Sequence, residues 1–447
     1  MGHPCSGVDF SMKLPVNDKA REESAVTERP HQQPNSASGL LKWLVFLMFA
    51  MFAMTTDSVG TVIPQIIREF DLGMTAAGSF QYATMSGIAI SAISLGFLAD
   101  RIGRKSTILI GLVLFGLSSV AFAAGHDFLF FVVLLFVSGL GIGIFKAGAL
   151  ALIGDISRST REHSTIMNLV EGFFGAGAIV GPAVVAWSLQ EGLSWKWVYF
   201  LAAAICALLV AGALGARFPA PIRSSEKPAD PRDAARMMTD PTAMFFSTAL
   251  MLYVGAEAAI YVWAPTFLAN YDGPNAWLAI YAVSIFFVLR AAGRFLGVWL
   301  LARYDWTAVL AVCTVAMTIL FWIAVMGDRG VAIYALPATG LFMSILYPTI
   351  NSTGISCFEK ARHGSVAGLL LFFTCLSAVI APLAMALIGD GLGDARYSIA
   401  LGAVMATGLS IQCLWNWRKQ PFAARLAERN SADYRKEVII GDTGPTA

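Results

Sequence analysis

Polar and apolar positions along this 447-residue chain come in long blocks rather than in short alternating periods. Twelve blocks are mostly apolar over about 20 residues, the length that an α-helix needs to cross a bilayer. Strand-length alternation is absent, and backbone groups in lipid must be hydrogen-bonded internally, so each block is predicted to be a helix. The predicted spans lie near residues 41–63, 76–99, 106–124, 128–153, 164–187, 196–217, 243–269, 276–302, 307–326, 331–355, 362–388 and 397–417.

Composition supports a bilayer as the environment of these helices. The chain is 57% hydrophobic and only 13% charged, whereas soluble domains carry about 25% charged residues. The net charge of +2 gives no basis for a nucleic-acid partner. We find no metal-ligand spacing among the six cysteines, no phosphate-binding loop and no nucleophile motif. No cofactor, no metal and no enzymatic activity are therefore predicted.

The longest internal polar stretch, 217–241, contains five prolines and leaves six predicted helices on each side. An offset of 200 residues recurs between the halves: it links Asp57 to Glu257 and Pro182 to Pro382. We therefore expect an all-α membrane protein of two pseudo-symmetric six-helix bundles, related by an axis along the membrane normal. The expected parts are a disordered tail (1–38), an N-terminal bundle (39–217), a linker (218–241), a C-terminal bundle (242–418) and a second tail (419–447).

Basic residues in the loops predict the orientation. Thirteen lysines and arginines fall in the loops on the side of the termini, and four fall in the loops on the other side. Because loops rich in Lys and Arg stay in the cytoplasm, both termini are predicted to be cytoplasmic in a plasma (inner) membrane. The linker and both tails would then be cytoplasmic as well.

The loop between the second and third predicted helices carries a specific motif, residues 96–105 with the sequence GFLADRIGRK. Gly96 permits close helix approach, Gly103 permits a tight turn, and Asp100 stands near a helix N-terminus. This loop resembles the signature of the major facilitator superfamily. The resemblance implies a twelve-helix transporter in which Asp100, Arg101 and Arg104 help to latch the bundles; the alternative is a basic loop that serves only orientation.

Further segments resemble one branch of that superfamily, the fucose/glucose/galactose proton symporters. The segments are 57–64, 168–182, 253–257, 293–295 and 342–350. The resemblance implies alternating access and proton-coupled uptake of neutral sugars. The chain departs from it in the fourth helix, where several members carry an acid and, four residues later, an asparagine; here Lys146 and Leu150 occupy these positions. A base in place of an acid favours an anionic substrate, such as a sugar acid or another organic anion.

Asp57 and Glu257 are the candidate proton carriers. Both lie within apolar helices, the first and the seventh, that line the cavity in the resembled fold. Charged groups within a membrane are costly and usually functional, and low dielectric favours the protonated carboxyl group. The alternative is structural: each acid caps backbone groups near its proline or pairs with a base.

Three further ionisable residues are candidates for substrate contact. Lys146 and Glu171 are predicted at the same depth. Either the two residues form an ion pair, or Lys146 binds an anionic substrate and Glu171 releases that substrate as the cavity opens. Arg290 either pairs with Glu257 or serves as a second anion-binding base. Arg294 matches the Gly-Arg pair of the resembled family, which implies a role in the gate.

Polar aromatic residues supply a candidate binding surface. Tyr253 and Tyr261 flank Glu257 at helical spacing, and Tyr347 and Asn351 follow one another by one turn of the tenth helix. Tyrosine rings stack on sugars or organic scaffolds, and the amide of Asn351 can donate hydrogen bonds. Ordinary helix packing is the alternative for each aromatic residue.

Taken together, these residues predict a secondary transporter that couples protons to uptake of a small polar solute, either anionic or a sugar, and works as a monomer. A proton-coupled efflux antiporter is the first alternative, since the glycine-rich fifth helix partly resembles the antiporter signature, although Val184 and Val185 replace its closing glycines. A membrane sensor that binds solute without transport is the second alternative.

Overall fold

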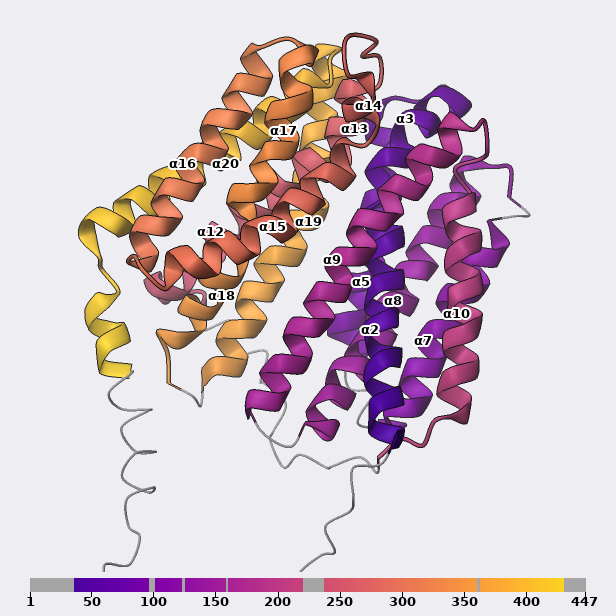
Figure 1. Ribbon diagram of the computed structural model, residues 1–447, viewed down its shortest axis with the longest axis horizontal. Coiled ribbons are helices and arrows are strands. Elements are labelled where there is room, and N and C mark those ends of the chain that lie inside the picture. The colour runs from indigo at the N-terminus through magenta and orange to yellow at the C-terminus, as the bar shows by residue number, and fades with distance from the viewer. Residues whose placement is uncertain are drawn as a thin grey trace, which may run out of the picture.

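The computed structural model describes residues 36–95, 101–122, 125–157, 160–219, 237–359 and 362–429. Within these ranges the chain is helical and contains no strand. The helices form two bundles that stand side by side (Figure 1). The two-bundle, all-helical architecture predicted from the sequence is confirmed.

The N-terminal bundle contains eight described helices, two of which, α2 and α3, form one span. Its helices are α2 (Ser36–Thr56), α3 (Val59–Phe70), α4 (Met74–Ala77), α5 (Ser79–Leu95), α7 (Arg104–Ala121), α8 (Phe128–Ile156), α9 (Thr160–Gln190) and α10 (Trp197–Gly215).

The C-terminal bundle repeats this plan with more interruptions. Its elements are α12 (Pro241–Ala258), the π-helix η2 (Ala259–Trp263), α13 (Ala264–Leu268), α14 (Ala276–Ile280), α15 (Ala282–Leu301), α16 (Trp306–Met326), α17 (Arg329–Met343), α18 (Leu346–Ser356), α19 (His363–Leu392) and α20 (Arg396–Lys419).

Eleven stretches of the described residues are long and apolar enough to cross a membrane. The remaining predicted span corresponds to α5, which ends at Leu95, next to residues outside the described ranges. The first span runs to Phe70, seven residues beyond its predicted end, because α3 continues past Pro64. The disordered tail expected at 1–38 is wrong at residues 36–38, which form the first turn of α2, and its remainder lies outside the described residues. Residues 220–236 of the expected linker and 430–447 of the expected second tail also lie outside them.

The first and seventh spans are both interrupted beside their acidic residue. In the first span, α2 ends at Thr56 and α3 begins at Val59, so Asp57 lies at the break. In the seventh span, η2 starts two residues after Glu257. Proline has no N–H, so Pro265 cannot donate to the carbonyl of Tyr261 four residues earlier. Short π-helical turns are frequent at functional sites.

The two interruptions touch each other where the bundles meet. A Cβ atom added to Gly60 would lie 1.8 Å from the carbonyl oxygen of Tyr261, so only glycine allows the two backbones to approach this closely. Each half thus brings its irregular backbone to the seam between the bundles. Irregular backbone within a membrane is tolerated where protein or a cavity surrounds it.

The bundles are closed at the end of the molecule that carries α3, α4 and α13, which we call the gate end (Figure 1). There the Asp390 carboxylate of α19 accepts hydrogen bonds from the backbone N–H groups of Met74 and Thr75, each at 2.7 Å. The Tyr281 hydroxyl donates to Gln190 at 3.0 Å, which also joins the two bundles. The Asp390 contacts hold the N-terminus of α4 against α19, and the Tyr281 contact holds the end of α9 against the start of α15.

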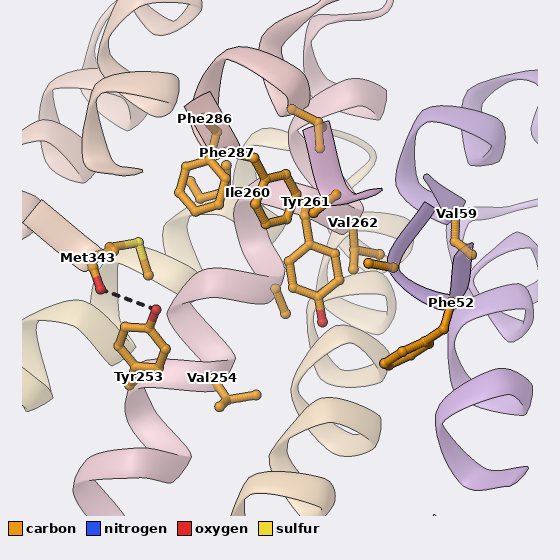
Figure 2. Packing of buried hydrophobic residues seen from close by; sticks show 14 of the residues in the cluster. Phe52, Val59, Tyr253, Val254, Ile260, Tyr261, Val262, Phe286, Phe287 and Met343 are labelled. Atoms are coloured by element: carbon orange, nitrogen blue, oxygen red, sulfur yellow. Dashed lines mark hydrogen bonds between the residues drawn. The ribbon is translucent and has the colours of Figure 1, made fainter. Parts of the chain in front are cut away.

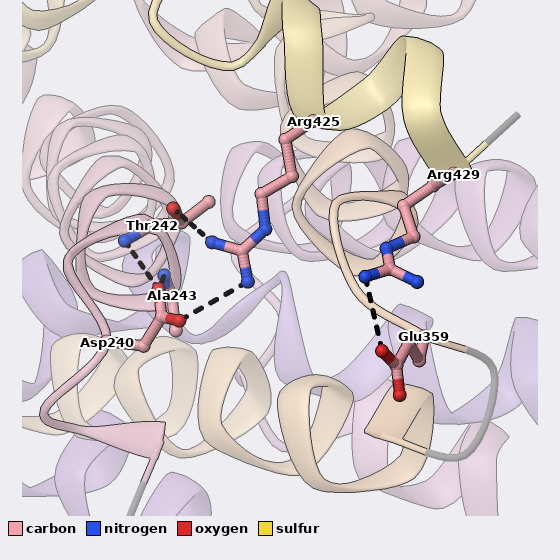
Figure 3. Close-up of polar contacts among 6 residues, drawn as sticks. All are labelled: Asp240, Thr242, Ala243, Glu359, Arg425 and Arg429. Carbon is pink, nitrogen blue, oxygen red and sulfur yellow. Dashed lines mark hydrogen bonds and ion pairs between the residues drawn. The ribbon is translucent and has the colours of Figure 1, made fainter.

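At the other end, which we call the terminal end, the chain after α20 docks on the C-terminal bundle (Figure 3). Residues 423–429 are helical. The Arg425 guanidinium donates to Thr242 at 2.8 Å and lies 3.3 Å from Asp240, and Arg429 lies 3.2 Å from Glu359. The first part of the expected C-terminal tail thus contacts the N-terminus of α12 and Glu359, which lies in the loop after α18.

Asp240 is the centre of this docking contact. Burial raises the pKa of its carboxyl, but hydrogen bonds from the Ala243 backbone N–H, the Arg425 guanidinium and the Thr242 backbone N–H more than offset burial and hold the pKa below its usual range. The folded protein therefore favours the ionised form of the Asp240 carboxyl group. The stabilisation is complete above the usual aspartate pKa and is lost as pH falls through the lowered folded value.

We predict that Arg425→Ala releases residues 423–429 and raises their amide hydrogen-exchange rates about fivefold, since partly exposed ion pairs contribute at most about 1 kcal/mol. Arg418→Ala, at an exposed arginine of the same region in the last turn of α20, is the matched control. Hydrogen-exchange mass spectrometry at pH 7 measures both variants. Equal exchange in the two variants would contradict the docking role of Arg425.

Candidate functional site

A cavity of about 730 Å³ lies between the two bundles and is lined by both. It extends to Leu301 and Ser352, near the terminal ends of α15 and α18, while the contacts of the gate end close the opposite side. The polar and charged residues that line it are Asp57, Asn168, Glu171, Glu257, Tyr261, Arg290, Arg294, Ser344, Tyr347, Thr349, Asn351, Ser352 and Thr374.

Asp57 enters the cavity wall from the break between α2 and α3. It is 8% exposed, and its Oδ2 atom is buried without a hydrogen-bond partner in the described part of the chain. Its neighbours Thr55, Thr56 and Ser58 all donate to carbonyls of the preceding turn and leave no hydroxyl for the carboxyl group. A buried carboxylate without donors is costly, so this environment favours a bound proton or a nearby cation.

Glu257 enters from the other bundle and is paired. The Arg290 guanidinium of α15 forms an ion pair with its Oε1 atom. The hydroxyl of Tyr253 lies 3.4 Å from the same oxygen and 3.3 Å from the carbonyl oxygen of Met343 (Figure 2). Of the two alternatives predicted for Arg290, the structure contains the pairing with Glu257; the Nε atom of Arg290 is buried and has no partner among the described residues.

Lys146 lies in α8 beside the aromatic side of the cavity. Its Nζ atom is 5.2 Å from the centre of the Phe52 ring, and Phe52 contacts Phe174, which lines the cavity. Glu171, Cys375 and Asp57 are the ionisable groups in its surroundings, yet no carboxylate of the described residues lies within ion-pair distance of it. Lys146 itself is not among the residues that line the cavity.

Of the two alternatives predicted for Lys146 and Glu171, the ion pair is therefore not formed in this structure. Glu171 lies 3.7 Å from Arg294 instead, and this contact joins α9 to α15 across the two bundles. The sequence predicted a common depth for both residues but could not show that α15 brings a competing cation, Arg294, to Glu171. About half of the Glu171 side chain is exposed, so this pair is a weak one.

Aromatic residues surround these charges in two ways. Tyr261 projects from η2 into the cavity wall, toward the side where Phe52 of the other bundle lies (Figure 2), and its hydroxyl accepts a hydrogen bond from Gln81 at 3.3 Å. Tyr253 is fully buried and contacts the cavity only through Glu257 and the ring of Tyr347, 5.8 Å away. Tyr347 and Asn351 line the cavity directly.

Several lining residues were missed by the sequence analysis. Gln81 touches Tyr261, and Asn168, Ser344 and Thr374 line the cavity. Gln81 stands alone as an amide within an otherwise apolar predicted span, which is a signal that could have identified it. Serine and threonine in membrane helices give no such signal, because most of them bond to the carbonyl one turn earlier.

The gating motif is described only in part. Gly96 and Asp100 lie outside the described residues. Arg101 is exposed, and Gly103 has φ +88° directly before α7, a conformation that favours glycine. Arg104 is buried and its Nε atom lies 2.8 Å from Asp155, so this arginine ties α7 to α8 within one bundle.

Comparison with known proteins assigns the fold. The family model of the Major Facilitator Superfamily matches residues 45–382. Protein TsgA of Salmonella arizonae is 23% identical over 369 residues, covering 80% of this chain and 93% of that protein, and protein TsgA of an Escherichia coli O6 strain is 22% identical over 320 residues, covering 72% and 80%.

Solved structures agree with this fold. A nucleoside transporter, NupG, superposes with a TM-score of 0.71 at 15% identity, covering 85% of this chain and 99% of that one. The E. coli fucose:proton symporter FucP gives 0.59 at 22% identity, covering 85% and 98%. A D-xylose–proton symporter gives 0.64 at 15% identity, covering 84% and 97%.

We predict that Asp390→Ala weakens closure of the gate end, because the free N–H groups of α4 lose their acceptor from the other bundle. In a cysteine-free background carrying Gln190→Cys and Tyr281→Cys, cross-linking by a short bis-maleimide should fall severalfold. Asp328→Ala, which removes a helix cap within the C-terminal bundle alone, is the control. Unchanged cross-linking in Asp390→Ala would show that the remaining seam contacts suffice.

Proposed function

The chain belongs to the major facilitator superfamily, and we propose that it takes up a small anionic solute together with protons by alternating access. The observation that carries this proposal is the arrangement of charges in the cavity: Asp57 is buried and forms no ion pair with the described residues, whereas Glu257 is held by Arg290. A proton carrier needs a group whose charge can change, and a solute site needs cations that are not fully neutralised by the protein.

The size of the cavity fits a metabolite. Small-molecule sites span about 300–1,000 Å³, and this cavity has about 730 Å³. Its wall combines hydroxyl and amide groups with the rings of Tyr261 and Tyr347, which suits a polyhydroxylated or planar organic molecule. The proposed solutes are therefore sugar acids and related organic anions, with neutral sugars as the runner-up.

We expect the terminal end to lie in the cytoplasm of a plasma (inner) membrane, because loops rich in Lys and Arg favour that side. With that orientation the cavity opens inward and the gate end closes it from the outside. The structure then corresponds to the state that releases solute and protons to the cytoplasm, and the opposite state requires separation of Asp390 from α4. A single chain contains both bundles, so the proposed working unit is a monomer.

The anionic preference rests on Lys146. FucP, the D-xylose symporter and NupG are named for neutral or weakly ionised solutes, and none of these names decides the substrate here. Lys146 has no carboxylate partner among the described residues, so it supplies a positive charge next to the cavity that a substrate can neutralise.

We predict that Asp57→Asn abolishes proton-driven accumulation while downhill exchange continues, because an amide cannot carry a proton through the cycle. Glu257→Gln should also abolish accumulation, since it leaves Arg290 without its counter-charge. Glu69→Gln, at an acid that contacts Trp195 outside the cavity, is the control. Uptake and counterflow in proteoliposomes measure these effects, and full accumulation in both cavity variants would refute the assignment.

The direction of proton flow in the same proteoliposomes separates uptake from efflux. Proton entry together with solute entry supports symport, and proton entry against solute exit supports the antiporter. Binding without counterflow would support a sensor.

We predict that Lys146→Ala weakens solute binding by about 1–2 kcal/mol, the order expected for a charge that acts across several ångströms at an effective dielectric of about 20, and that Lys146→Arg retains part of the affinity. Glu171→Ala should change affinity less, because Glu171 is paired with the partly exposed Arg294. Calorimetry on the purified variants measures the affinities. Unchanged affinity in Lys146→Ala would return neutral sugars to first place.

A further inference from the structure

The described charged groups around the cavity form two ion pairs, and two further groups have no counter-charge in direct contact. Glu257 is paired with Arg290 in the C-terminal bundle, and Glu171 is paired with Arg294 across the bundles. Asp57 and Lys146 remain, both in the N-terminal bundle, and no carboxylate of the described residues lies within ion-pair distance of Lys146. Each is an ionisable neighbour of the other without direct contact, alongside Glu257 and Arg290 for Asp57 and Glu171 and Cys375 for Lys146.

Binding of one proton changes the net charge of these groups. The described charged side chains that line or adjoin the cavity are Asp57, Glu171, Glu257, Lys146, Arg290 and Arg294. With all six ionised, three negative charges face three positive ones and the site is neutral. A proton on Asp57 leaves the site with one uncompensated positive charge, which is that of Lys146. In a low-dielectric cavity such a charge requires a partner.

Among the described residues around Asp57, Glu257 and Glu171 are already held by arginines, so neither is a free counter-charge for Lys146; the thiol of Cys375 in α19 is the further titratable neighbour of Lys146. α8 presents Lys146, α12 presents Glu257, α15 presents Arg290, and η2 presents the hydroxyl of Tyr261. α9 packs along α2 and presents Glu171, which acts on Lys146. α10 also packs on α2 but carries no charged residue between Trp197 and Gly215. Among the described neighbours, only Asp57 and Lys146 lack a counter-charge in direct contact.

We infer that the Asp57 carboxylate and an anionic substrate compete to be the counter-charge of Lys146. The transporter therefore carries one proton with one monovalent organic anion and moves no net charge. When Asp57 is ionised, it compensates Lys146 and repels an entering anion. When Asp57 is protonated, the anion becomes the counter-charge of Lys146. The proton therefore passes to and from the Asp57 carboxyl, no other bond is made or broken, and the loaded site is neutral. This inference rests on the proposed function and gives it a stoichiometry and a substrate charge.

The test begins with binding. The purified protein is titrated between pH 5.5 and 8 with matched pairs of probes: D-galacturonate with D-galactose, D-glucuronate with D-glucose, and D-gluconate with sorbitol. We expect at least one monoanion to bind, with affinity that falls about tenfold per pH unit where Asp57 is ionised, since one proton is linked to one anion. Asp57→Asn should bind the same anion with less than about twofold change across this range, and Glu69→Gln should keep the slope.

Binding of a neutral member alone, an affinity independent of pH in the unmodified protein, or binding of no member of the series would each overturn the inference. If Asp57→Asn is poorly folded, Lys146→Arg provides the second variant: it keeps the charge and should keep the pH slope. A flat profile in well-folded Lys146→Arg would overturn the competition between Asp57 and substrate for this position.

The electrical readout separates this inference from the proposed function. In proteoliposomes with a pH gradient, valinomycin and potassium set the membrane potential. We expect accumulation of the anion to follow the pH gradient and to change less than about twofold with an imposed potential. Proton-driven accumulation that an inside-negative potential strongly accelerates would overturn the one-to-one stoichiometry and leave proton coupling intact. No proton-driven accumulation of a bound anion would overturn the proposed function itself.

Discussion

A charge inside a membrane protein must be paired, neutralised by a proton or neutralised by a ligand, and this constraint organises the centre of the molecule. Arg290 satisfies it for Glu257, and Arg294 satisfies it for Glu171. Asp57 and Lys146 satisfy it only in part, because they are ionisable neighbours but neither forms an ion pair with the described residues. A site that is almost but not fully compensated can change its net charge cheaply, whereas a fully paired network would resist both proton and solute.

The same constraint explains why the cavity lies where it does. Broken helices expose carbonyl groups that lipid cannot satisfy, so the breaks next to Asp57 and Glu257 must face protein or water. Gly60 lets the two breaks come into contact, and the acids beside them consequently face the same cavity from opposite bundles. Closure at Asp390 and opening toward Leu301 and Ser352 then follow from how the bundles tilt about this contact (Figure 1).

The helical two-bundle fold could be predicted from the sequence, since the length of the apolar blocks and the offset of 200 residues can be read directly from it. Asp57, Glu257 and Arg290 were singled out because an ionisable residue is conspicuous in an apolar span. The partner of Glu171 could not be predicted, because it depends on the height at which α15 crosses α9. The position of Lys146 behind Phe52 likewise depends on ring packing between α2 and α8, which leaves no periodic signal.

The π-helix η2 has a consequence for the duplication. Asp57 and Glu257 differ by 200 positions, but Pro64 and Pro265 differ by 201, and Pro182 and Pro382 again by 200. One additional residue in an α-helix would turn everything beyond it by about 100° and advance it by 1.5 Å. The wider turn of η2 absorbs that residue, so the segments on either side of it keep the phase of their counterparts. The seventh span thus contains one additional residue between Glu257 and Pro265, held in a π-helical turn. A shift of this turn along the helix would rotate Glu257 relative to the gate end without breaking the span.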